Sequence, residues 1–259
     1  MLIRILAGLA LIPLVIFVIL GGLPLYLAEA VLLFIAINEF FKAFENKEVK
    51  PIYTIGYLFI GYLFIKNYLK LSIDYTHMFI FALFIYSITY LLRLKNNIMD
   101  ISITFFGVFY ILIGMDFIVL TRDSFELGNV YVYTIFLIAF ATDTFAYFTG
   151  YLFGKHKLIP KVSPKKTIEG SIGGIVGSTV FCILFGYIFK LNMSHLAVIG
   201  FFGSIIAQFG DLFASSIKRY VGIKDYGKLI PGHGGILDRF DSVILVAPFV
   251  YYAVLFFTI

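Results

Sequence analysis

Residues 5–37 read ILAGLALIPLVIFVILGGLPLYLAEAVLLFIAI, two apolar runs separated only by Gly21 and Gly22. Each run suits a helix that crosses the hydrocarbon core of a membrane, which is about 30 Å thick. Arg4 before the first run is also typical of a secretory signal peptide. A second apolar run follows at once, however, and more come after it. We therefore reject the signal peptide and expect the two runs to form a tight hairpin or a re-entrant pair.

The composition is that of a membrane protein. The chain has 259 residues, of which 61% are hydrophobic and 14% charged, and its mean hydropathy is +0.99. A soluble domain is about half apolar and about one quarter charged. The one cysteine, Cys182, lies in an apolar run over residues 175–189, where we expect a small buried side chain.

Further apolar runs predict an all-α integral membrane protein with about nine transmembrane helices. The second and third runs are short, so their ends are the least certain. The nine predicted spans are residues 5–20, 23–37, 52–65, 76–92, 98–120, 131–153, 171–189, 195–216 and 242–259.

The distribution of basic residues supports this count and orients the chain. Alternate connections hold 16 of the 20 Lys and Arg residues, and the opposite set holds 4. Because cytoplasmic loops carry an excess of Lys and Arg, the N-terminus is predicted in the cytoplasm and the C-terminus outside. The two most polar loops, 154–170 and 217–241, then share the cytoplasmic face of the cell (inner) membrane.

No loop is long enough to form a soluble domain, so any chemistry must be built from these two loops and the helix ends beside them. Most of the Gly, Ser and Asp residues with a plausible role lie in the last four spans. We therefore predict an N-terminal transmembrane scaffold over residues 1–128. A C-terminal transmembrane catalytic region over residues 129–259 would carry both cytoplasmic loops.

Two aspartates inside predicted spans are candidates for function. An ionised carboxylate at membrane depth costs at least a few kcal/mol, and both Asp143 and Asp211 lie there. The alternative for each is a structural hydrogen bond to a neighbouring helix. Small residues recur at helical spacing around Asp211 and predict that its face meets another helix. This stripe is Gly200, Ser204, Ala207, Asp211 and Ser215.

Four other acidic residues at membrane depth or its edge are expected to be structural, because the sequence shows no polar company for them. They are Glu29, Glu39, Asp100 and Asp116.

The loop over residues 162–170 reads VSPKKTIEG. Ser163 followed by Pro164 is typical of a helix start, and a helix N-terminus beside Lys165 and Lys166 would bind phosphate. The alternative is a solvated lysine pair, or one that attracts anionic lipid headgroups. Glycines spaced four apart after this loop predict close packing of the next span; they are Gly170, Gly174, Gly173 and Gly177.

The stretch from residue 215 to residue 242 combines cations, carboxylates and glycines immediately before the last span. Lys218, Arg219 and Arg239 can clamp phosphates. Asp238 and Asp241 would share one helix face and, with the aspartate at 211, could hold a hard divalent ion such as Mg²⁺. A solvated loop does not need carboxylates and glycines at this density.

This stretch resembles the signature of the phosphatidate cytidylyltransferases, also called CDP-diacylglycerol synthases. The pattern is Ser-x-x-Lys-Arg, Lys-Asp and His-Gly-Gly-x-x-Asp-Arg-x-Asp, and every position is matched between Ser215 and Asp241. Upstream, Asp143, the run from Ser163 to Thr167, and Glu169-Gly170 also match. The motifs cover about 100 residues, and the N-terminal half resembles the family only in hydropathy.

The resemblance implies an all-helical membrane enzyme, a homodimer, and a cavity open to cytosol and lipid. It implies that CTP and phosphatidate react to give CDP-diacylglycerol and pyrophosphate in phospholipid biosynthesis. Membrane lipids are further partners, and no nucleic acid is expected. The cofactor implied is Mg²⁺, with a second cation such as K⁺, on Asp211, Asp238 and Asp241.

The resemblance also assigns site residues. The catalytic positions implied are Asp211, Lys218, Arg219, Asp238, Arg239 and Asp241. The substrate-binding positions implied are Asp143, Ser163, Lys165, Lys166, Thr167, Glu169, Lys224, Asp225, His233, Gly234 and Gly235.

Two other functions share part of this pattern. A secondary transporter also carries carboxylates at membrane depth, but it is usually built from inverted repeats with interrupted helices near the midplane. An enzyme of the same chemistry could act on another lipid, such as an ether-lipid phosphate. The polar loops do not distinguish these lipids, because the headgroup chemistry is shared.

Overall fold

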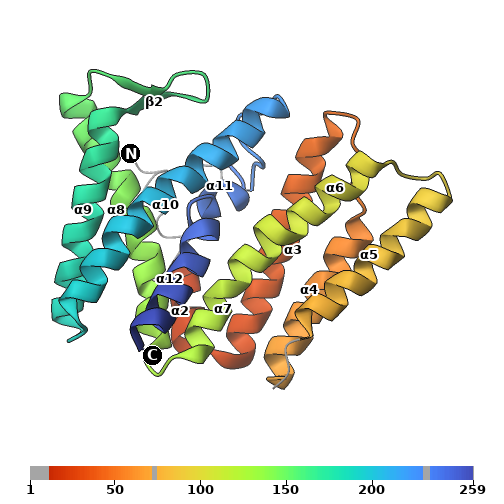
Figure 1. Cartoon of the computed structure of the whole chain (residues 1–259), viewed down its shortest axis with the longest axis horizontal. Helices are drawn as coiled ribbons and strands as arrows, with labels where there is room; N and C mark the ends of the chain where they lie inside the picture. The colour runs from red at the N-terminus through yellow and green to blue at the C-terminus, as the bar shows by residue number, and fades with distance from the viewer. Residues whose placement is uncertain (1–11, 72–74, 230–233, 259) are drawn as a thin grey trace. The chain divides into compact units, whose positions relative to one another are not determined.

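The computed structural model describes residues 12–71, 75–229 and 234–258, and this part is nearly all helical (Figure 1). Within the described residues, each of the nine predicted apolar segments coincides with a helix or a run of joined helices. The helices are α2 (Ile12–Leu20), α3 (Gly22–Glu45), α4 (Tyr53–Leu69), α5 (Thr76–Leu92), α6 (Ile98–Gly107), α7 (Gly114–Ser124), α8 (Gly128–Phe153), α9 (Ile168–Ile188), α10 (Met193–Tyr220), α11 (Leu237–Phe240) and α12 (Val243–Thr258). A π-helical segment, η1 (Val108–Ile113), joins α6 to α7.

Six helices in the described part of the chain are long and apolar enough to cross a membrane. α5 is an apolar helix of 17 residues. The predicted class, a nearly all-α multi-pass membrane protein, is therefore confirmed, while the count of nine spans stays a prediction. The six are Gly22–Glu45, Ile98–Ser124, Gly128–Phe153, Ile168–Ile188, Met193–Tyr220 and Leu237–Thr258.

The chain forms two compact units, each with its own packed helices. Unit 1 comprises residues 1–119 and 221–238, and unit 2 comprises residues 120–220 and 239–259. The polar stretch before the last helix thus contributes residues to both units.

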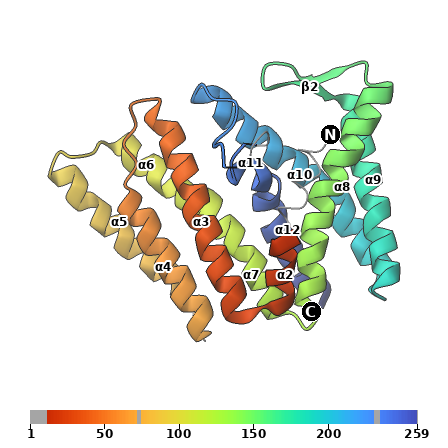
Figure 2. The ribbon, with the colours of Figure 1, turned by 180° about the vertical axis from the view of Figure 1, so that it is seen from behind.

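In unit 1, α3 packs against α4, α6 and η1 (Figure 2). The contact is close because glycines face the aromatic side of α3. A Cβ added at Gly56 would lie 3.2 Å from the ring of Phe41, and one added at Gly107 would lie 2.8 Å from the same ring. Phe40, Phe41 and Ile37 are fully buried in this core.

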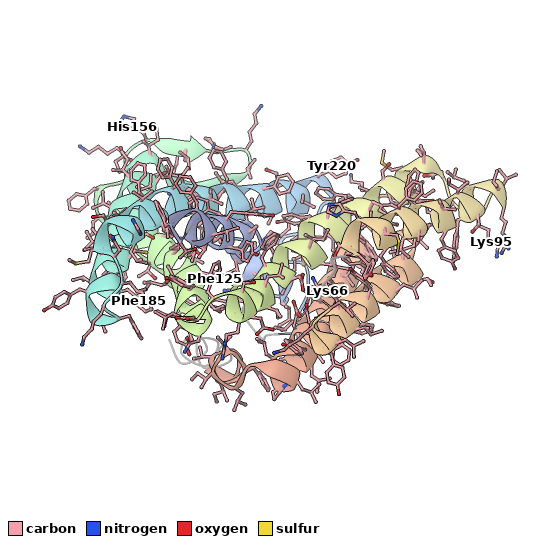
Figure 3. All side chains as sticks on the ribbon, turned by 60° about the horizontal axis from the view of Figure 1, so that its bottom comes forward. Lys66, Lys95, Phe125, His156, Phe185 and Tyr220 are labelled. Carbon is pink, nitrogen blue, oxygen red and sulfur yellow. The ribbon has the colours of Figure 1, made fainter. Side chains whose placement is uncertain are left out.

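A buried polar cluster joins α3, α4 and α7 of unit 1. The ammonium of Lys66 lies 2.6 Å from Asp116, and the amide of Asn67 donates to Asp116 at 3.0 Å and to Glu29 at 3.3 Å. Lys66 is labelled in Figure 3. The expectation that Glu29 and Asp116 have no polar company is wrong, because their partners lie on another helix, α4.

Asp100 also has polar partners, contrary to expectation. It forms a capping box with Asn97 at the start of α6, and it accepts a hydrogen bond of 2.7 Å from the backbone N–H of Lys50. Nearby, the hydroxyl of Thr104 accepts a 2.8 Å bond from the N–H of Ile52. Both side chains thus supply acceptors to the segment that precedes α4.

Unit 2 packs α8, α9, α10 and α12, and α8, α9 and α10 lie side by side in Figure 1. The predicted close packing at small residues is confirmed. Cβ atoms added at Gly174 and Gly177 would meet α8, and one at Gly200 would lie 2.8 Å from the Cβ of Cys182. Cys182 is buried, as predicted. Ser204 accepts a 3.0 Å hydrogen bond from Thr142 of α8, so the small-residue stripe of α10 faces protein.

A short hairpin of unit 2 precedes α9. Its strands, β1 (Lys157–Ile159) and β2 (Ser163–Thr167), pair antiparallel, with Lys157 opposite Thr167 and Ile159 opposite Ser163. The predicted helix start at Ser163-Pro164 is therefore wrong. α9 begins at Ile168, and its N-cap is Thr167, whose hydroxyl accepts a 3.1 Å bond from Gly170 N–H. Proline tolerates the edge of a two-stranded sheet, and Thr167 competes successfully for the cap.

Candidate active site

The centre of the candidate site in unit 2 is an ion pair between Lys166 of β2 and Asp211 of α10. The hairpin lies beyond the ends of α8 and α9 (Figure 1), which brings its second strand to this part of α10. Ser215, one helical turn after Asp211, donates a long hydrogen bond of 3.4 Å to the same carboxylate. One predicted site residue of the hairpin and one of a membrane helix are thus brought together.

Other charges of unit 2 surround this pair. Asp143 of α8 is exposed and lies close enough to Asp211, Lys166 and Arg239 for their charges to act on it. Asp241 follows α11 and is within electrostatic range of Asp211, Asp143 and Lys218. The cluster therefore combines three carboxylates with three cations, on β2, α8, α10 and the start of the last span.

A close backbone approach explains why Asp241 reaches this cluster. A Cβ added at Gly210 would lie 2.8 Å from the carbonyl oxygen of Asp241 and 3.1 Å from Cα of Ser242. Glycine at 210 lets α10 touch the turn between α11 and α12. The neighbouring residue of the helix is Asp211, so this contact places the two carboxylates near each other.

One side-chain pair that sequence analysis missed supports the cluster. Ser171, in the first turn of α9, donates a 2.5 Å hydrogen bond to the side chain of Gln208, which returns a 3.3 Å bond to the carbonyl of Ser171. Gln208 lies three residues before Asp211 and is buried. The sequence signal for this pair is Gln208 itself, a polar residue inside the predicted span 195–216.

Glu169 and Thr167 hold the base of the hairpin. The carboxylate of Glu169 lies 2.6 Å from Nδ1 of His156 and accepts bonds from the backbone N–H groups of Lys155 and His156 at 3.1 and 3.2 Å. His156 is labelled in Figure 3. Thr167 is buried and caps α9. These two predicted substrate-binding residues are engaged in fixing the hairpin on the helix that follows.

The rest of the hairpin is accessible. Lys165 is exposed, Ser163 is partly exposed, and Nε of Arg219 lies 3.4 Å from the carbonyl oxygen of Val162 in the turn between the strands. Lys218, in contrast, is buried at 8% relative exposure, although it is a lysine. A buried lysine needs counter-charge nearby, and Lys218 lies within electrostatic range of Asp241.

The remaining predicted residues belong to unit 1. The carboxylate of Asp238 accepts bonds from the backbone N–H groups of Tyr226 at 2.8 Å and Gly235 at 2.9 Å. Gly234 has a φ of +86°, a conformation that favours glycine. Lys224 and Asp225 are exposed, and His233 lies outside the described residues.

Among the predicted site residues, the side chains that could bind a metal ion strongly are the carboxylates and His233. In the described part of the chain, no three His, Cys, Asp or Glu side chains are placed to hold a metal ion together. Mg²⁺ in nucleotide sites is usually bound through one or two carboxylates, with phosphate oxygens and water completing the octahedron. The carboxylates of Asp211 and Asp241 are the donor type that such a site requires.

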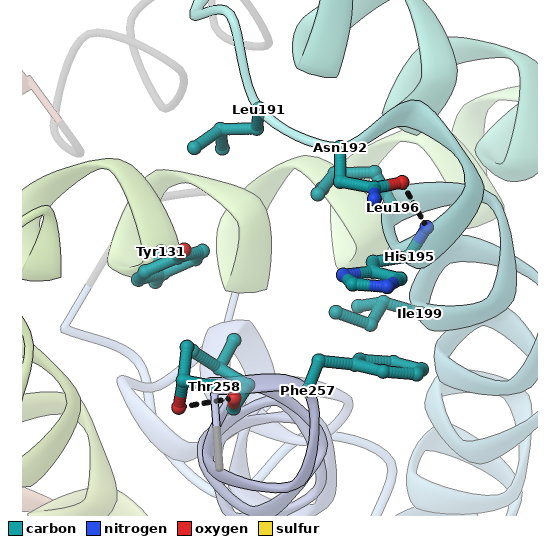
Figure 4. Close-up of a pocket in the computed structure, with 9 residues that line it drawn as sticks. Tyr131, Leu191, Asn192, His195, Leu196, Ile199, Phe257 and Thr258 are labelled. Carbon is teal, nitrogen blue, oxygen red and sulfur yellow. Dashed lines mark hydrogen bonds between the residues drawn. The ribbon is translucent and has the colours of Figure 1, made fainter.

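Unit 2 also contains a small pocket, formed by α8, α10 and α12 (Figure 4). The ring of His195 stacks on Phe257 with centroids 4.2 Å apart, and the side chain of Asn192 accepts a 3.2 Å bond from His195 N–H. None of the predicted site residues lines it. The lining residues are Tyr131, Leu191, Asn192, His195, Leu196, Ile199, Val254, Phe257 and Thr258.

Fold and site together define a multi-pass membrane protein with a cluster of acidic and basic side chains in unit 2. The chain belongs to the cytidylyltransferase family, whose model matches residues 2–257. A phosphatidate cytidylyltransferase of Bacillus subtilis (strain 168) is 35% identical over 263 residues, which is 98% of each chain.

Staphylococcal relatives match a shorter part of the chain. A phosphatidate cytidylyltransferase of Staphylococcus haemolyticus (strain JCSC1435) is 44% identical over 164 residues. One of Staphylococcus aureus (strain COL) is 43% identical over 164 residues. Each of these matches covers 62% of this chain and 62% of the relative.

Proposed function

We propose that this protein transfers the cytidylyl group of CTP to phosphatidate, which gives CDP-diacylglycerol and pyrophosphate. The observation that supports this most directly is the cluster centred on Lys166 and Asp211, in a chain of the cytidylyltransferase family. Nucleotidyl transfer asks chiefly for alignment and charge neutralisation, which such a cluster can supply. The product would serve phospholipid biosynthesis.

In the proposed reaction, a phosphate oxygen of phosphatidate attacks the α-phosphorus of CTP. A new P–O bond forms, the bond from the α-phosphorus to the bridging oxygen breaks, and pyrophosphate leaves in line with its electron pair. A phosphate monoester has a second pKa of about 6, so phosphatidate carries its own nucleophilic oxyanion at neutral pH. No protein side chain is required as a general base.

The protein's cations would hold the phosphates. Lys166 is held by Asp211 before any anion arrives, which lowers the cost of ordering it during the reaction. Lys218 and Arg239 lie within electrostatic range of the same group of carboxylates. Arg219, beside the hairpin turn, and the exposed Lys165 are suited to anions that approach from outside the cluster.

Mg²⁺ is part of the proposal, as is a second cation such as K⁺. Asp211, Asp238 and Asp241 would hold these cations, as the family resemblance implies. When bound, Mg²⁺ would neutralise phosphate charge and orient the triphosphate. The carboxylates would keep the neighbouring cations positioned, and the apolar helix ends would limit access of water.

The proposed setting is the cell membrane, with nine spans and both polar loops in the cytoplasm, where a soluble nucleotide meets a lipid headgroup. The bias of basic residues supports this orientation. We also propose a homodimer, on the family resemblance alone.

The decisive experiment incubates the purified protein with labelled CTP and a panel of lipid phosphates, with and without Mg²⁺. The panel contains phosphatidate, its ether-linked analogue and lysophosphatidate. Labelled CDP-lipid should appear with phosphatidate and Mg²⁺, and it should be lost in an Asp211→Asn variant. Faster turnover of the ether lipid would identify that lipid as the preferred substrate. Absence of labelled CDP-lipid with every lipid of the panel would contradict the proposal.

A further inference from the structure

Glu39 of α3 makes two hydrogen bonds to the backbone of the polar loop in unit 1. Its carboxylate accepts from the N–H of Ile236 at 3.1 Å and from the N–H of Leu237 at 2.9 Å. These N–H groups lie at the start of α11, where no helical carbonyl is available to accept them. Glu39 therefore acts as the acceptor for the turn that carries Asp238 and Arg239.

Two glycines of the loop leave room for this carboxylate because they have no side chain. A Cβ added at Gly235 or at Gly227 would collide with an oxygen of Glu39. The Cα of Gly235 would also lie 3.1 Å from a Cβ on Gly227, so the two backbone segments meet at the same place. Glycine at these positions thus lets the backbone close over the carboxylate.

The same turn is fixed from its other side by Asp238. Its Oδ2 accepts from Gly235 N–H at 2.9 Å and from Tyr226 N–H at 2.8 Å, which closes the loop on itself. The ring of Tyr226 lies 6.5 Å from that of Phe40, the residue next to Glu39 on α3. α3 therefore contacts the loop through both a carboxylate and an aromatic ring.

A carboxylate in a predominantly apolar helix is costly, because burial removes its water. The cost is offset here by two charge-assisted bonds to backbone donors, which are stronger than bonds between neutral groups. A purely apolar residue at position 39 would leave the two N–H groups of the turn without this acceptor. This arrangement makes the position of the loop depend on one side chain of α3.

We propose that Glu39 is a positioning residue for the reaction. It holds the turn over residues 234–238 in the conformation in which the Asp238 carboxylate accepts from Gly235 and Tyr226. Glu39 itself contacts no substrate. The inference rests on the proposed function for its kinetic consequences, and on the hydrogen bonds alone for its structural ones.

The test compares Glu39→Gln with Glu45→Gln in the full-length protein in lipid nanodiscs. Glutamine keeps the size of the side chain but offers one acceptor oxygen instead of two. Glu45 lies on the same helix, is exposed and accepts a 2.7 Å bond from Tyr53, so its variant is the matched control. For Glu39→Gln we expect kcat/KM to fall about tenfold or more, as for other residues that orient a site through a neighbour, with the control unchanged.

Hydrogen exchange gives a readout that needs no substrate. In Glu39→Gln, the amides of residues 236 and 237 should exchange at least several-fold faster, while α4 exchanges at the wild-type rate. Unchanged exchange at these amides would overturn the inference even if activity fell. If wild-type protein lacks activity but exchange changes as expected, the proposed function fails and the structural role of Glu39 stands.

A double-mutant cycle on Gly235 and Glu39 supplies a second test. Gly235→Ala should inactivate the enzyme, because its methyl group collides with the Glu39 carboxylate. Glu39→Asp shortens that side chain by one methylene, so the double variant should be several-fold more active than Gly235→Ala alone. Equal activity of Gly235→Ala in the two backgrounds would contradict the assigned contact.

Discussion

Lys166 of the hairpin strand β2 pairs with Asp211 of α10, and this contact joins the two polar regions of unit 2. A lysine used only to attract anionic lipid would need no fixed counter-charge. Here the ammonium is held beside a cluster of carboxylates, which suits a group that must meet a phosphate in one orientation.

Lys166→Met is therefore expected to lower kcat/KM by about 30-fold, since a charge-assisted hydrogen bond contributes about 2 kcal/mol. Lys161→Met is the control, because Lys161 is exposed in the turn of the same hairpin. Both variants are assayed in vesicles of increasing anionic lipid content and at decreasing ionic strength. Surface attraction is screened by salt and replaceable by other charges, so full recovery of Lys166→Met under these conditions would remove it from the site.

Replacement of the carboxylates should separate metal binding from folding. Asp211→Asn, Asp238→Asn and Asp241→Asn are each expected to abolish turnover while the protein still inserts and purifies. EDTA should abolish turnover by the wild-type protein, and added Mg²⁺ should restore that turnover. Turnover of the wild type in the absence of divalent metal would contradict the proposed Mg²⁺ site.

The nine-span topology can be tested by cysteine labelling in a Cys182→Ser background. Cysteines at Ser163 and Lys228 should react with an impermeant reagent only from the cytoplasmic side, and one at Lys190 only from outside. If the cysteines at 163 and 190 react from the same side, the predicted span count is wrong. Removal of Cys182 is safe for interpretation because this buried thiol is the only one in the chain.

Alanine substitutions at two glycines are expected to change thermal stability in different ways. Gly200→Ala should lower the thermal midpoint, because the added methyl would lie 2.8 Å from the Cβ of Cys182, and overpacking costs about 1–3 kcal/mol. Gly61→Ala in α4 should leave the midpoint unchanged or raise it, since no atom lies within 4 Å of its Cβ position and alanine is the better helix former. Thermal unfolding in detergent measures both, and equal midpoints would contradict the packing of α9 on α10.

The sequence was sufficient for the helices because lipid forces the backbone to satisfy its hydrogen bonds within each apolar segment. The small-residue stripe of α10 and the glycines of α9 were also informative, since close helix packing in membranes depends on them. The helix start at Ser163 was predicted wrongly because Ser-Pro suits both a helix N-terminus and the edge of a short sheet. Only the pairing with Lys157–Ile159 decides between the two.

Glu39 illustrates what sequence patterns do not reveal. Its partners are backbone N–H groups almost 200 positions later in the chain, and any residue type except proline could supply them. Glu29 and Asp116 were misjudged for a related reason, because Asn67 and Lys66 approach them from another helix. Side-chain spacing within one segment carries no information about such contacts.

The π-helical turn over Val108–Ile113 has a consequence for the faces of the long helix from Ile98 to Ser124. In a regular α-helix, Asp100 and Asp116 would point about 160° apart, since each residue advances about 100°. A π turn holds one additional residue and turns the following segment back by about 100°, so both carboxylates can face the same neighbour. Asp100 binds the N–H of Lys50 just before α4, and Asp116 binds Lys66 near its end. The extra residue thus works as a one-residue insertion that the π turn absorbs. If the same residues formed a regular α-helix, Asp116 would rotate by about 100° and Lys66 would lose its counter-ion in the apolar interior.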